Sequence, residues 1–571
     1  MLTDLNQDQN QAVLDDSLVL VVLAGPGTGK TKTLVAKAQY LLTQQQVSSD
    51  QLCLISFTNK ACQEISSRIT KEYSPLVTTF HALALQILTS SGQEVKIAPP
   101  EMINQLASQV INELKTDQSV KDLLLEISYL KNTQTDLENL GLKLFTDSLE
   151  RLKLMDFDDL LIQSIKVLED QKLHQYWQQK CQYLFVDEFQ DTSILQYQLI
   201  KMLRPDHLMV IGDPLQSIYS FRGADGNIFD QLSIDYPQLK QIRLSTHYRS
   251  RPEIISTALK LFTNPELLNS VKDQGGEIQI VTTFNQVSES KWTENKILEL
   301  MGGSDLNNSI QNDQNLNFCD FAVIFRTRKL AQDFMSNFSQ SGLPVQLIGE
   351  LSPFLDPKVI MIISVFKFLV SGDLFELGLL KLTQKNLLRL SLLRSKETTF
   401  PLLVEEILEV LKIPKADRSL DLDFVLQTLS QFQDQKNYLQ KMLKYYQQIN
   451  GQEYFDTTVD KIAVMTIHSV KGLEFNTVFI GGFEQGLIPH QRAIENNQLD
   501  EEKRLLFVAM TRAKERLFLI KTQKRWGQKT ITSTFEELIY DHCQHLIDQE
   551  ITKILCRQKK RAEKNRQKSL F

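Results

Sequence analysis

Residues 17–34 of this chain read SLVLVVLAGPGTGKTKTL, and this stretch decides the fold. The apolar run 17–24 predicts a buried strand, the glycine-rich run after it predicts a tight loop, and residues 34–42 favour a helix. In this order of elements the backbone N–H groups of the loop turn inward beside the start of the helix, an arrangement that suits a phosphate group. The sequence therefore predicts a phosphate-binding loop within an α/β domain.

Small residues surround the expected phosphate position. Lys30 would reach the β and γ oxygens of a nucleotide, and the Thr31 hydroxyl can ligate Mg²⁺. Ala24 stands where the general pattern G-x-x-x-x-G-K-[ST] has its first glycine. The residues expected to form this site are Ala24, Gly25, Pro26, Gly27, Thr28, Gly29, Lys30 and Thr31.

A pair of carboxylates directly follows another apolar run, residues 183–186. Asp187 would hold Mg²⁺, and Glu188 would polarise the attacking water. Two acids after a strand are often only solvated side chains. Together with the phosphate loop, however, they favour nucleotide hydrolysis over nucleotide binding alone, with ATP and Mg²⁺ as the expected cofactors.

Further apolar runs alternate with two long helical blocks. Continuous apolar runs are typical of parallel sheets that are covered by helices on both faces. The fold class predicted is therefore α/β, with two parallel-sheet units that are each interrupted by a helical insertion. The apolar runs are 51–58, 207–213, 277–283, 321–326, 463–467 and 477–482, and the helical blocks are 81–177 and 370–453.

The composition excludes several classes of protein. The chain has 571 residues, of which 42% are hydrophobic, so it is neither disordered nor fibrous. No apolar run is long enough to cross a membrane, and the N-terminus lacks the features of a signal peptide. The six cysteines form no C-x-x-C pair, which favours the cytoplasm. A net charge of −6 still leaves room for a local nucleic-acid groove.

The segments VDEFQDTS (186–193) and VIGDPLQSIYSFRGA (210–224) resemble motifs II and III of UvrD/Rep/PcrA-type superfamily 1 DNA helicases. Other segments resemble the remaining motifs of this family in the same order along the chain. They are LNQDQNQA (5–12), the phosphate loop (24–31), SFTNKA (56–61), VTTFHALA (77–84), LSTHYRS (244–250), VMTIHSVKGLEF (464–475) and EEKRLLFVAMTRAKERL (501–517).

The resemblance implies a role for each matching residue around ATP. Gln9 would read adenine, Tyr248 would stack on the base, Gln216 would sense the γ-phosphate and Glu474 would bind the ribose hydroxyls. Arg249 and Arg512 would act as arginine fingers from the opposite domain. Lys32 replaces the arginine that relatives commonly carry at this position, and an ammonium stacks on a base less well than a guanidinium does.

The resemblance also implies a path for DNA across both α/β domains. Aromatic side chains would stack on successive bases, which tolerates any sequence, and polar side chains would contact the backbone. Phe221 stands where relatives commonly have tryptophan. The expected DNA-binding residues are Phe57, Asn59, Thr79, Phe80, His81, Tyr219, Phe221, Arg222 and His468.

The implied domain plan has two RecA-like domains, 1A and 2A, with helical insertions 1B and 2B. The 2B block is shorter than is typical of this family, which puts its usual roles in doubt. The basic tail would contact nucleic acid or a repair or replication protein, unless it is only a solvated face. The expected bounds are 1–85 and 178–243 for 1A, 86–177 for 1B, 244–369 and 455–545 for 2A, 370–454 for 2B and 546–571 for the tail.

The function expected from the resemblance is an ATP-dependent DNA helicase that translocates 3′ to 5′ on single-stranded DNA. It would unwind duplex DNA in repair or replication restart. One alternative is a translocase that strips proteins from single strands without efficient unwinding, and another is a nucleotide-switched repair scaffold. An RNA substrate is also open, because stacking pockets do not by themselves reject the 2′-hydroxyl.

Overall fold

The structure is a computed structural model of the whole chain. It describes residues 4–220, 223–224, 226–263, 265–302, 316–338, 342–348, 357–377, 382–394, 399–414, 422, 425–426, 429–430, 432–433, 437–449 and 459–548. The contacts divide the chain into two compact units. The first comprises Met1–Gly276 and Asp500–Phe507, and the second comprises Glu277–Leu499 and Val508–Phe571.

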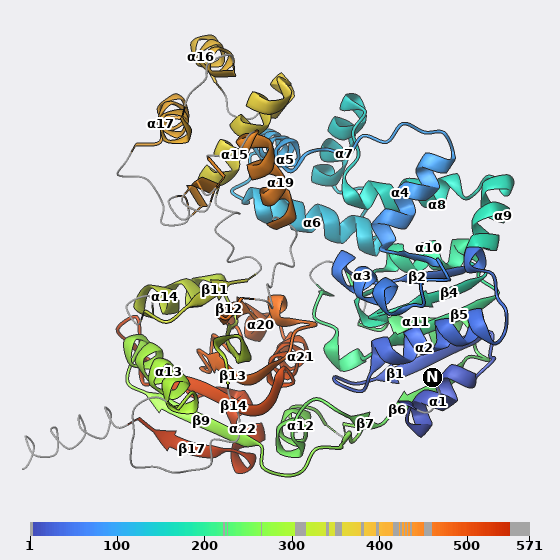
Figure 1. The fold of residues 1–571 in the computed structure, drawn as a ribbon, viewed down its shortest axis with the longest axis vertical. Coiled ribbons are helices and arrows are strands. Elements are labelled where there is room, and N and C mark those ends of the chain that lie inside the picture. Colours follow the sequence, from blue (N-terminus) through green and yellow to red (C-terminus); the bar gives the residue numbers. More distant parts are fainter. Residues whose placement is uncertain are drawn as a thin grey trace, which may run out of the picture. The chain divides into compact units, whose positions relative to one another are not determined.

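A parallel sheet forms the centre of the first unit (Figure 1). Every strand pair in it is parallel. The two strands followed by the phosphate loop and the carboxylate pair therefore have their carboxyl ends at one edge of the sheet. The strand order is β3 (Leu76–Thr78), β2 (Leu52–Ile55), β4 (Tyr183–Val186), β5 (His207–Gly212), β1 (Val19–Ala24) and β6 (Lys240–Leu244).

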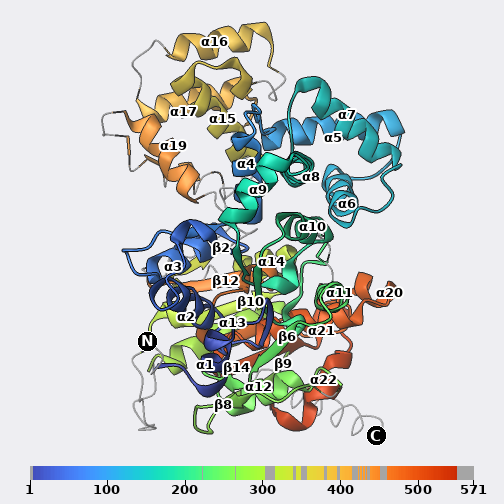
Figure 2. The ribbon, with the colours of Figure 1, turned by 90° about the vertical axis from the view of Figure 1, so that its right-hand side faces the viewer.

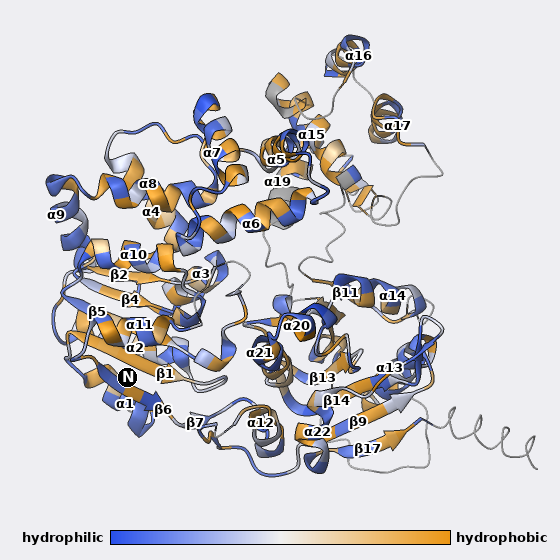
Figure 3. Ribbon diagram, turned by 180° about the vertical axis from the view of Figure 1, so that it is seen from behind, coloured by the Kyte–Doolittle hydropathy of each residue, from blue (hydrophilic) through white to orange (hydrophobic). Residues whose placement is uncertain are grey.

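Alternate residues of β1 pack into two different cores, one on each face of the sheet. Leu20 and Val22 belong to the core that contains α2, whereas Val21 belongs to the core that contains α4 and α10. Figure 3 shows the apolar residues gathered along the strands. The helices of this region are α1 (Gln7–Leu14), α2 (Lys30–Thr43), α3 (Asn59–Arg68), α4 (Phe80–Ser90), α10 (Ile194–Leu203), α11 (Ile228–Asp235) and α12 (Pro252–Leu259).

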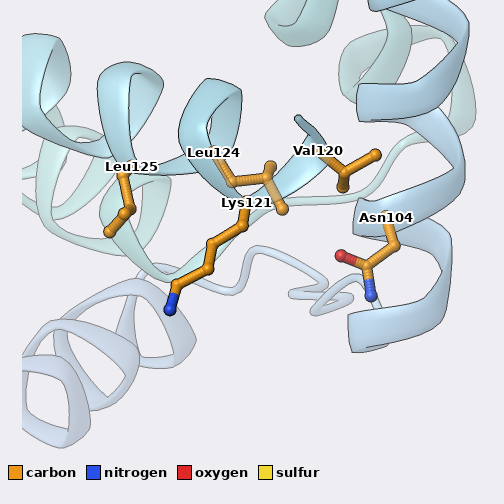
Figure 4. A pocket seen from close by; sticks show the side chains of 5 residues that line it. All are labelled: Asn104, Val120, Lys121, Leu124 and Leu125. Atoms are coloured by element: carbon orange, nitrogen blue, oxygen red, sulfur yellow. The ribbon is translucent and has the colours of Figure 1, made fainter. Parts of the chain in front are cut away.

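Five more helices follow α4 before β4 begins, as the periodicity of this block predicts. Three of them, α5 (Pro100–Leu114), α6 (Val120–Thr133) and α7 (Leu140–Leu152), share a core of their own and lie together in Figure 2. The others, α8 (Phe157–Val167) and α9 (Gln171–Lys180), contribute to the core of the sheet. An open pocket of about 570 Å³ lies between α5 and α6, lined by Asn104, Val120, Lys121, Leu124 and Leu125 (Figure 4).

The second unit contains another parallel sheet. Its strand order is β11 (Val345–Leu347), β12 (Ile462–Thr466), β10 (Phe321–Phe325), β13 (Phe475–Gly481), β14 (Ala513–Thr522), β9 (Glu277–Thr283) and β17 (Gln544–Ile547). The predicted α/β class with two parallel sheets is thereby confirmed. Helices in the same part of the chain are α13 (Gln286–Leu300), α14 (Arg328–Phe338), α20 (Gln491–Glu495), α21 (Leu499–Met510) and α22 (Thr534–Ile539).

A separate helical core interrupts the second sheet between β11 and β12. Its apolar residues come mainly from α15 (Pro357–Ser371), α16 (Gln384–Arg394), α17 (Phe400–Val410) and α19 (Tyr438–Ile449). None of the helices that the structure describes is both long and apolar enough to cross a membrane. The tail that begins at residue 546 lies outside the described residues from position 549 onward.

Candidate functional site: a nucleotide pocket and an aromatic pair

Two glycines in the left-handed region of the backbone shape the phosphate loop. The φ angle is 65° at Gly27 and 87° at Gly29, which caps α2. A Cβ atom at Gly27 would lie 2.6 Å from Arg249 Cβ, and one at Gly29 would lie 2.6 Å from Gln9 Nε2. Both positions thus require glycine for conformation as well as for space.

Hydrogen bonds fix the carbonyl oxygens of the loop. Lys30 Nζ donates to Ala24 O at 3.4 Å, and Thr28 Oγ1 donates to Gly25 O at 2.8 Å. Gln9 Nε2 donates to Thr28 O at 3.0 Å. Because the C=O and N–H of a trans peptide point in opposite directions, fixing the carbonyls also fixes where the N–H groups point. The loop is therefore held in one shape with backbone donors available to an anion.

The carboxylate pair lies beside the loop, as predicted. Lys30 Nζ is 3.9 Å from Glu188 Oε1. The neighbouring Asp187 is buried, and its carboxylate accepts hydrogen bonds from Ser56 Oγ at 3.3 Å and from Glu188 N at 3.0 Å. Burial, helped by the charge of Glu188, raises the pKa of Asp187 to about 7. A nearby cation would favour the charged form of this buried carboxyl group, so the group can bind one.

A chain of side chains orients Glu188. Its backbone is left-handed, with φ at 50°, and its carboxylate accepts a hydrogen bond from Gln190 Nε2. Gln190 Oε1 in turn accepts from Asp213 N at 2.9 Å. Gln216 Nε2 donates to Asp213 Oδ2 at 2.7 Å, and burial raises the pKa of Asp213. The predicted sensor Gln216 is thus linked to the predicted catalytic acid through two residues.

The donor set at this position fits Mg²⁺. Mg²⁺ usually keeps several waters and binds through one or two carboxylates together with phosphate oxygens, so a full cage of protein ligands is not required. Asp187 offers a buried carboxylate, and Thr31 lies in the first turn of α2, which the phosphate loop precedes. No group of three or more acidic, histidine or cysteine side chains in the described part of the chain could hold a metal by itself.

The residues predicted for the base end lie close together. Asn6 and Gln9 cap α1 reciprocally, through Asn6 N to Gln9 Oε1 at 3.1 Å and Gln9 N to Asn6 Oδ1 at 2.8 Å. Asn6 Nδ2 also donates to the Tyr248 hydroxyl at 2.8 Å, and the Tyr248 side chain is exposed. The exposed Lys32 donates to the backbone oxygen of Asp4. These contacts bring three of the predicted base-binding residues to one side of the loop.

Two residues from the quoted segments 56–61 and 210–224 form an aromatic pair. The rings of Phe57 and Tyr219 are stacked, with centroids 5.2 Å apart and planes 18° apart. His81 contacts the exposed ring of Phe157 edge-on, with centroids 5.9 Å apart. Burial lowers the pKa of His81, so the ring is held neutral near pH 7. These half-buried rings lie on the first unit and offer faces to flat ligands.

The prediction for Phe80 is wrong. Its side chain is only 5% exposed and belongs to the core beneath the sheet, because it starts the apolar face of α4. Asn59 is exposed at the start of α3, and the Thr79 hydroxyl caps α4 by accepting from Ala82 N at 3.3 Å. The predicted contacts Phe221 and Arg222 lie outside the described residues.

Family models match both halves of the chain. The UvrD/REP helicase N-terminal domain matches residues 5–140 and 99–237, and the UvrD-like helicase C-terminal domain matches residues 242–375 and 394–524. The chain belongs to the UvrD/REP helicase family. The resemblance stated from the motifs is thereby confirmed.

Curated relatives in this helicase family match along most of their length. The ATP-dependent DNA helicase Rep of Buchnera aphidicola subsp. Schizaphis graminum is 28% identical, over 93% of this chain and 95% of the relative. The ATP-dependent DNA helicase PcrA of Bacillus subtilis is 27% identical, over 92% and 84% respectively. A probable DNA helicase II homolog of Mycoplasma capricolum subsp. capricolum is 27% identical, over 91% and 84%.

In this member of the UvrD/REP helicase family, Arg249 lies in the same unit as Lys30. The family resemblance implies instead that Arg249 comes from the opposite domain. The difference arises in the segment after β6, the edge strand that pairs with β1 in the first sheet. The segment that follows β6 then runs along the phosphate loop, where Tyr248 N donates to Gly27 O at 2.9 Å.

Glu474, Arg512 and His468 lie in the second unit. Arg512 is buried after α21, where Nε donates to Val508 O at 2.9 Å and Nη1 to Leu473 O at 3.4 Å. Glu474 pairs with Lys514 Nζ at 2.8 Å. His468 begins a short 3₁₀ helix directly after β12. The roles predicted for these residues toward a nucleotide or DNA remain predictions.

Motif matching does not single out Ser56, Gln190 and Asp213, although each contributes to the site. All three occur in quoted motifs, and each comes shortly after a buried strand of the first sheet. The carboxyl ends of parallel strands share one edge, so every polar residue at such an end is a candidate. Applied to β2, β4 and β5, this rule finds Ser56 and Asp213 directly and Gln190 a few residues later.

Proposed function

We propose that this chain is an ATP-dependent DNA helicase that moves 3′ to 5′ along single-stranded DNA and unwinds duplex DNA. One observation carries the proposal. Lys30 Nζ, at the end of the glycine-rich loop, lies 3.9 Å from Glu188 Oε1, and the neighbouring Asp187 is buried. The names of the curated relatives, ATP-dependent DNA helicases Rep and PcrA, support DNA as the polymer. Repair or replication restart in the cytoplasm is the setting we propose.

The residues of the first unit have different roles toward ATP. Lys30 and the loop N–H groups bind the phosphates, while Glu188, oriented by Gln190, accepts a hydrogen bond from the attacking water. Asp187 and Thr31 would hold Mg²⁺, which neutralises phosphate charge when it is bound. Gln216, tied to Asp213, lies where it can respond to the γ-phosphate.

DNA would follow the exposed aromatic surface. Phe57 and Tyr219 now contact each other, so a base that enters between them gains two stacking faces. Asn59, Thr79 and His81 of the first unit and His468 of the second would contact the backbone of the strand. In the proposed plan of RecA-like domains 1A and 2A with insertions 1B and 2B, Arg512 from 2A would complete the nucleotide site when ATP binds.

An ATPase titration tests this proposal. Purified protein is assayed with no polynucleotide, with a DNA oligonucleotide and with the RNA of the same sequence, at saturating ATP and Mg²⁺. We expect DNA to stimulate hydrolysis and RNA to do so weakly. Lys30→Ala should lose ATP binding, whereas Glu188→Gln should lose turnover and keep the binding of ATP and DNA. Hydrolysis that ignores polynucleotide would overturn the motor, and equal stimulation by RNA would overturn the choice of DNA.

A strand-displacement assay with and without a protein roadblock separates unwinding from stripping. The expected insertion 370–454, which carries α16, α17 and α19, is short, and this favours the stripping translocase as the second candidate function. We expect displacement of an unblocked duplex. Removal of the roadblock without strand displacement would favour the translocase. A protein that neither displaces the strand nor removes the roadblock, and that hydrolyses little ATP, would favour the nucleotide-switched scaffold.

A further inference from the structure

His247 lies at the centre of the contacts that hold the phosphate loop. It ends the short strand β7 (Thr246–His247), which pairs with β8 (Asn269–Ser270). Its side chain is fully buried. Nδ1 is 2.6 Å from Pro26 O, and Nε2 is 2.8 Å from Ser250 N. One imidazole thus connects the loop to the segment that carries Tyr248 and Arg249.

These two hydrogen bonds determine the form of the ring. A carbonyl oxygen only accepts, so Nδ1 carries the proton and donates to Pro26 O. A backbone N–H only donates, so Nε2 is the bare nitrogen that accepts from Ser250 N. The ring is therefore the neutral Nδ1–H tautomer. Neither a doubly protonated ring nor the other tautomer can make both bonds.

The hydrogen bond from His247 adds Pro26 O to the loop carbonyls that accept hydrogen bonds. Pro26 O takes the Nδ1 proton, and Gly27 O takes the backbone N–H of Tyr248 at 2.9 Å. Each of these carbonyls is held on the side of β7, so the peptide N–H groups that face away from them stay available to an anion. The contact is close as well, since a Cβ at Gly27 would lie 2.9 Å from His247 Cε1.

We propose that His247 is a positioning residue for nucleotide binding, which holds the phosphate loop through its Nδ1–H bond to Pro26 O. The proposal rests on the proposed function of the loop as the ATP site. It gives His247 no contact with ATP. Its effect is to keep the Pro26 and Gly27 peptides in the orientation that binds phosphate before the ligand arrives.

Two substitutions separate the roles of the two ring nitrogens. An asparagine at this position places its amide nitrogen near the place of Nδ1, so His247→Asn keeps a donor for Pro26 O. A glutamine places its amide near the place of Nε2, so His247→Gln keeps a partner for Ser250 N and loses the donor to the loop. The exposed His542, remote in sequence from every predicted site residue, supplies the control His542→Gln.

The dissociation constant of a fluorescent ATP analogue with Mg²⁺ is measured for each protein. We expect His247→Gln to raise it about tenfold or more, as a lost buried hydrogen bond would, with His247→Asn close to wild type and His542→Gln unchanged. In steady-state assays the KM for ATP of His247→Gln should rise more than kcat falls, because the lost contact acts on binding.

Thermal melting of each variant shows whether it folds. Wild-type affinity in folded His247→Gln, or an equal loss in both His247 variants, would overturn the proposal. If His247→Gln fails to fold, His247→Asn decides alone: retained affinity supports the proposal and lost affinity overturns it. Failure of the helicase proposal is separate, because it would appear as wild-type protein whose hydrolysis DNA does not stimulate, while the binding comparison still tests His247.

Discussion

At the scale of single residues, the Gln190 amide connects Glu188, the carboxylate proposed to polarise the attacking water, to the end of the next strand. Its nitrogen donates to Glu188, and its oxygen accepts from Asp213 N. A side chain that uses both ends in this way fixes the direction of a neighbouring carboxylate without touching the substrate. The rate of ATP hydrolysis should therefore depend on whether the Gln190 amide has room to keep this position.

Gly212 provides that space, which leads to a first prediction. A Cβ at Gly212 would lie 2.3 Å from Gln190 Oε1, whereas one at Gly226 meets nothing within 4 Å. We expect Gly212→Ala to displace the amide and lower kcat for ATP by about tenfold or more, with a smaller change in KM. Gly226→Ala is the control and should behave as wild type. Equal kcat values in steady-state assays of the two variants would contradict this prediction.

A second prediction concerns the buried acid Asp187. Its pKa of about 7 lies above the ordinary value of 3.8, so the folded state takes up a proton that the unfolded state does not hold between these values. The contribution of Asp187 to the free energy of unfolding therefore increases as the pH falls through about 7. At about pH 8 and above this contribution stays at its lowest level. Without Mg²⁺, Asp187→Asn should raise Tm at about pH 8. In assays with Mg²⁺, the same substitution should abolish ATP hydrolysis.

Differential scanning fluorimetry with a chelator checks this prediction. The gain in Tm should shrink at about pH 5.5, where wild-type Asp187 is protonated in the folded state. Ser67→Ala, an exposed substitution on α3, is the control and should leave Tm unchanged at both pH values. A lower Tm for Asp187→Asn at about pH 8 would show that the charge is already compensated.

At the scale of elements, a buried ionic cluster joins the ends of β13 and β14 to α13. Arg525 Nη1 is 2.9 Å from Glu289 Oε2, and Arg525 Nε is 2.9 Å from Glu484 Oε2. Glu289 also accepts from Gly482 N at 2.9 Å. Burial raises the pKa of Glu289, and the charge of Arg525 opposes that rise. One arginine is therefore paired with two buried carboxylates.

Removing this arginine gives a third prediction. Arg525→Met should destabilise the second unit by about 3–5 kcal/mol, because it leaves buried carboxylates without their cation. Arg389→Ala, which breaks an exposed pair with Glu409, is the matched control and should leave the unfolding midpoint unchanged. Urea unfolding followed by circular dichroism measures both. Equal midpoints for the two variants would mean that the cluster contributes little.

The aromatic pair gives a fourth prediction at this scale. Phe57 follows β2 and Tyr219 follows β5, so two loops of one sheet edge supply the two rings. Tyr219→Ala should weaken binding to a fluorescent single-stranded oligonucleotide by about 1–3 kcal/mol, regardless of its sequence. Tyr176→Ala on α9, which removes an exposed ring elsewhere in the unit, is the control. Fluorescence anisotropy that shows equal affinities would remove the pair from the proposed DNA path.

The sequence predicts the central strands well and the edge strands poorly. β1, β4 and β5 are buried on both faces, so they read as continuous apolar runs. In contrast, β6 reads KQIRL and alternates, because it lies at the edge of its sheet, and β17 is exposed at every position. This alternation explains why the apolar runs of the sequence reveal β1, β4 and β5 but not β6.

The residues of the site follow the same physical rule. The phosphate loop and Asp187–Glu188 can be recognised from local sequence, since backbone geometry and strand position determine their chemistry. The buried Phe80 and the contacts of His247 cannot, because each depends on partners that are distant in the chain. A motif identifies which residue occupies a position, but only the packing shows whether its side chain reaches solvent.

At the scale of the whole molecule, the chain passes between its two units at Gly276–Glu277, Leu499–Asp500 and Phe507–Val508. The last two crossings both fall within α21. In the first unit, Arg504 Nε of this helix donates to Ser217 O at 2.9 Å, and Glu501 accepts from Ser220. The loop that carries Tyr219 is thus attached to the helix that leads to Arg512.

A fifth prediction follows for the coupling of hydrolysis to DNA. Arg504→Ala should keep the ATPase rate measured without DNA and lose most of the stimulation by single-stranded DNA, because Tyr219 would no longer be tied to α21. Lys503→Ala, on the same helix and paired with Asp500 at 3.2 Å, is the control. ATPase assays across a DNA titration measure the effect. Full stimulation of Arg504→Ala would place the coupling elsewhere.

The double crossing at α21 has a mechanical consequence. A helix is stiff along its axis, and in α21 both ends belong to the second unit while the middle, Asp500–Phe507, belongs to the first. The middle turns are held within the first unit by the contacts of Arg504 with Ser217 and of Glu501 with Ser220. The same short stretch of backbone is therefore shared by the two units, and a substitution that loosens its middle turns should be felt by residues on both sides of it.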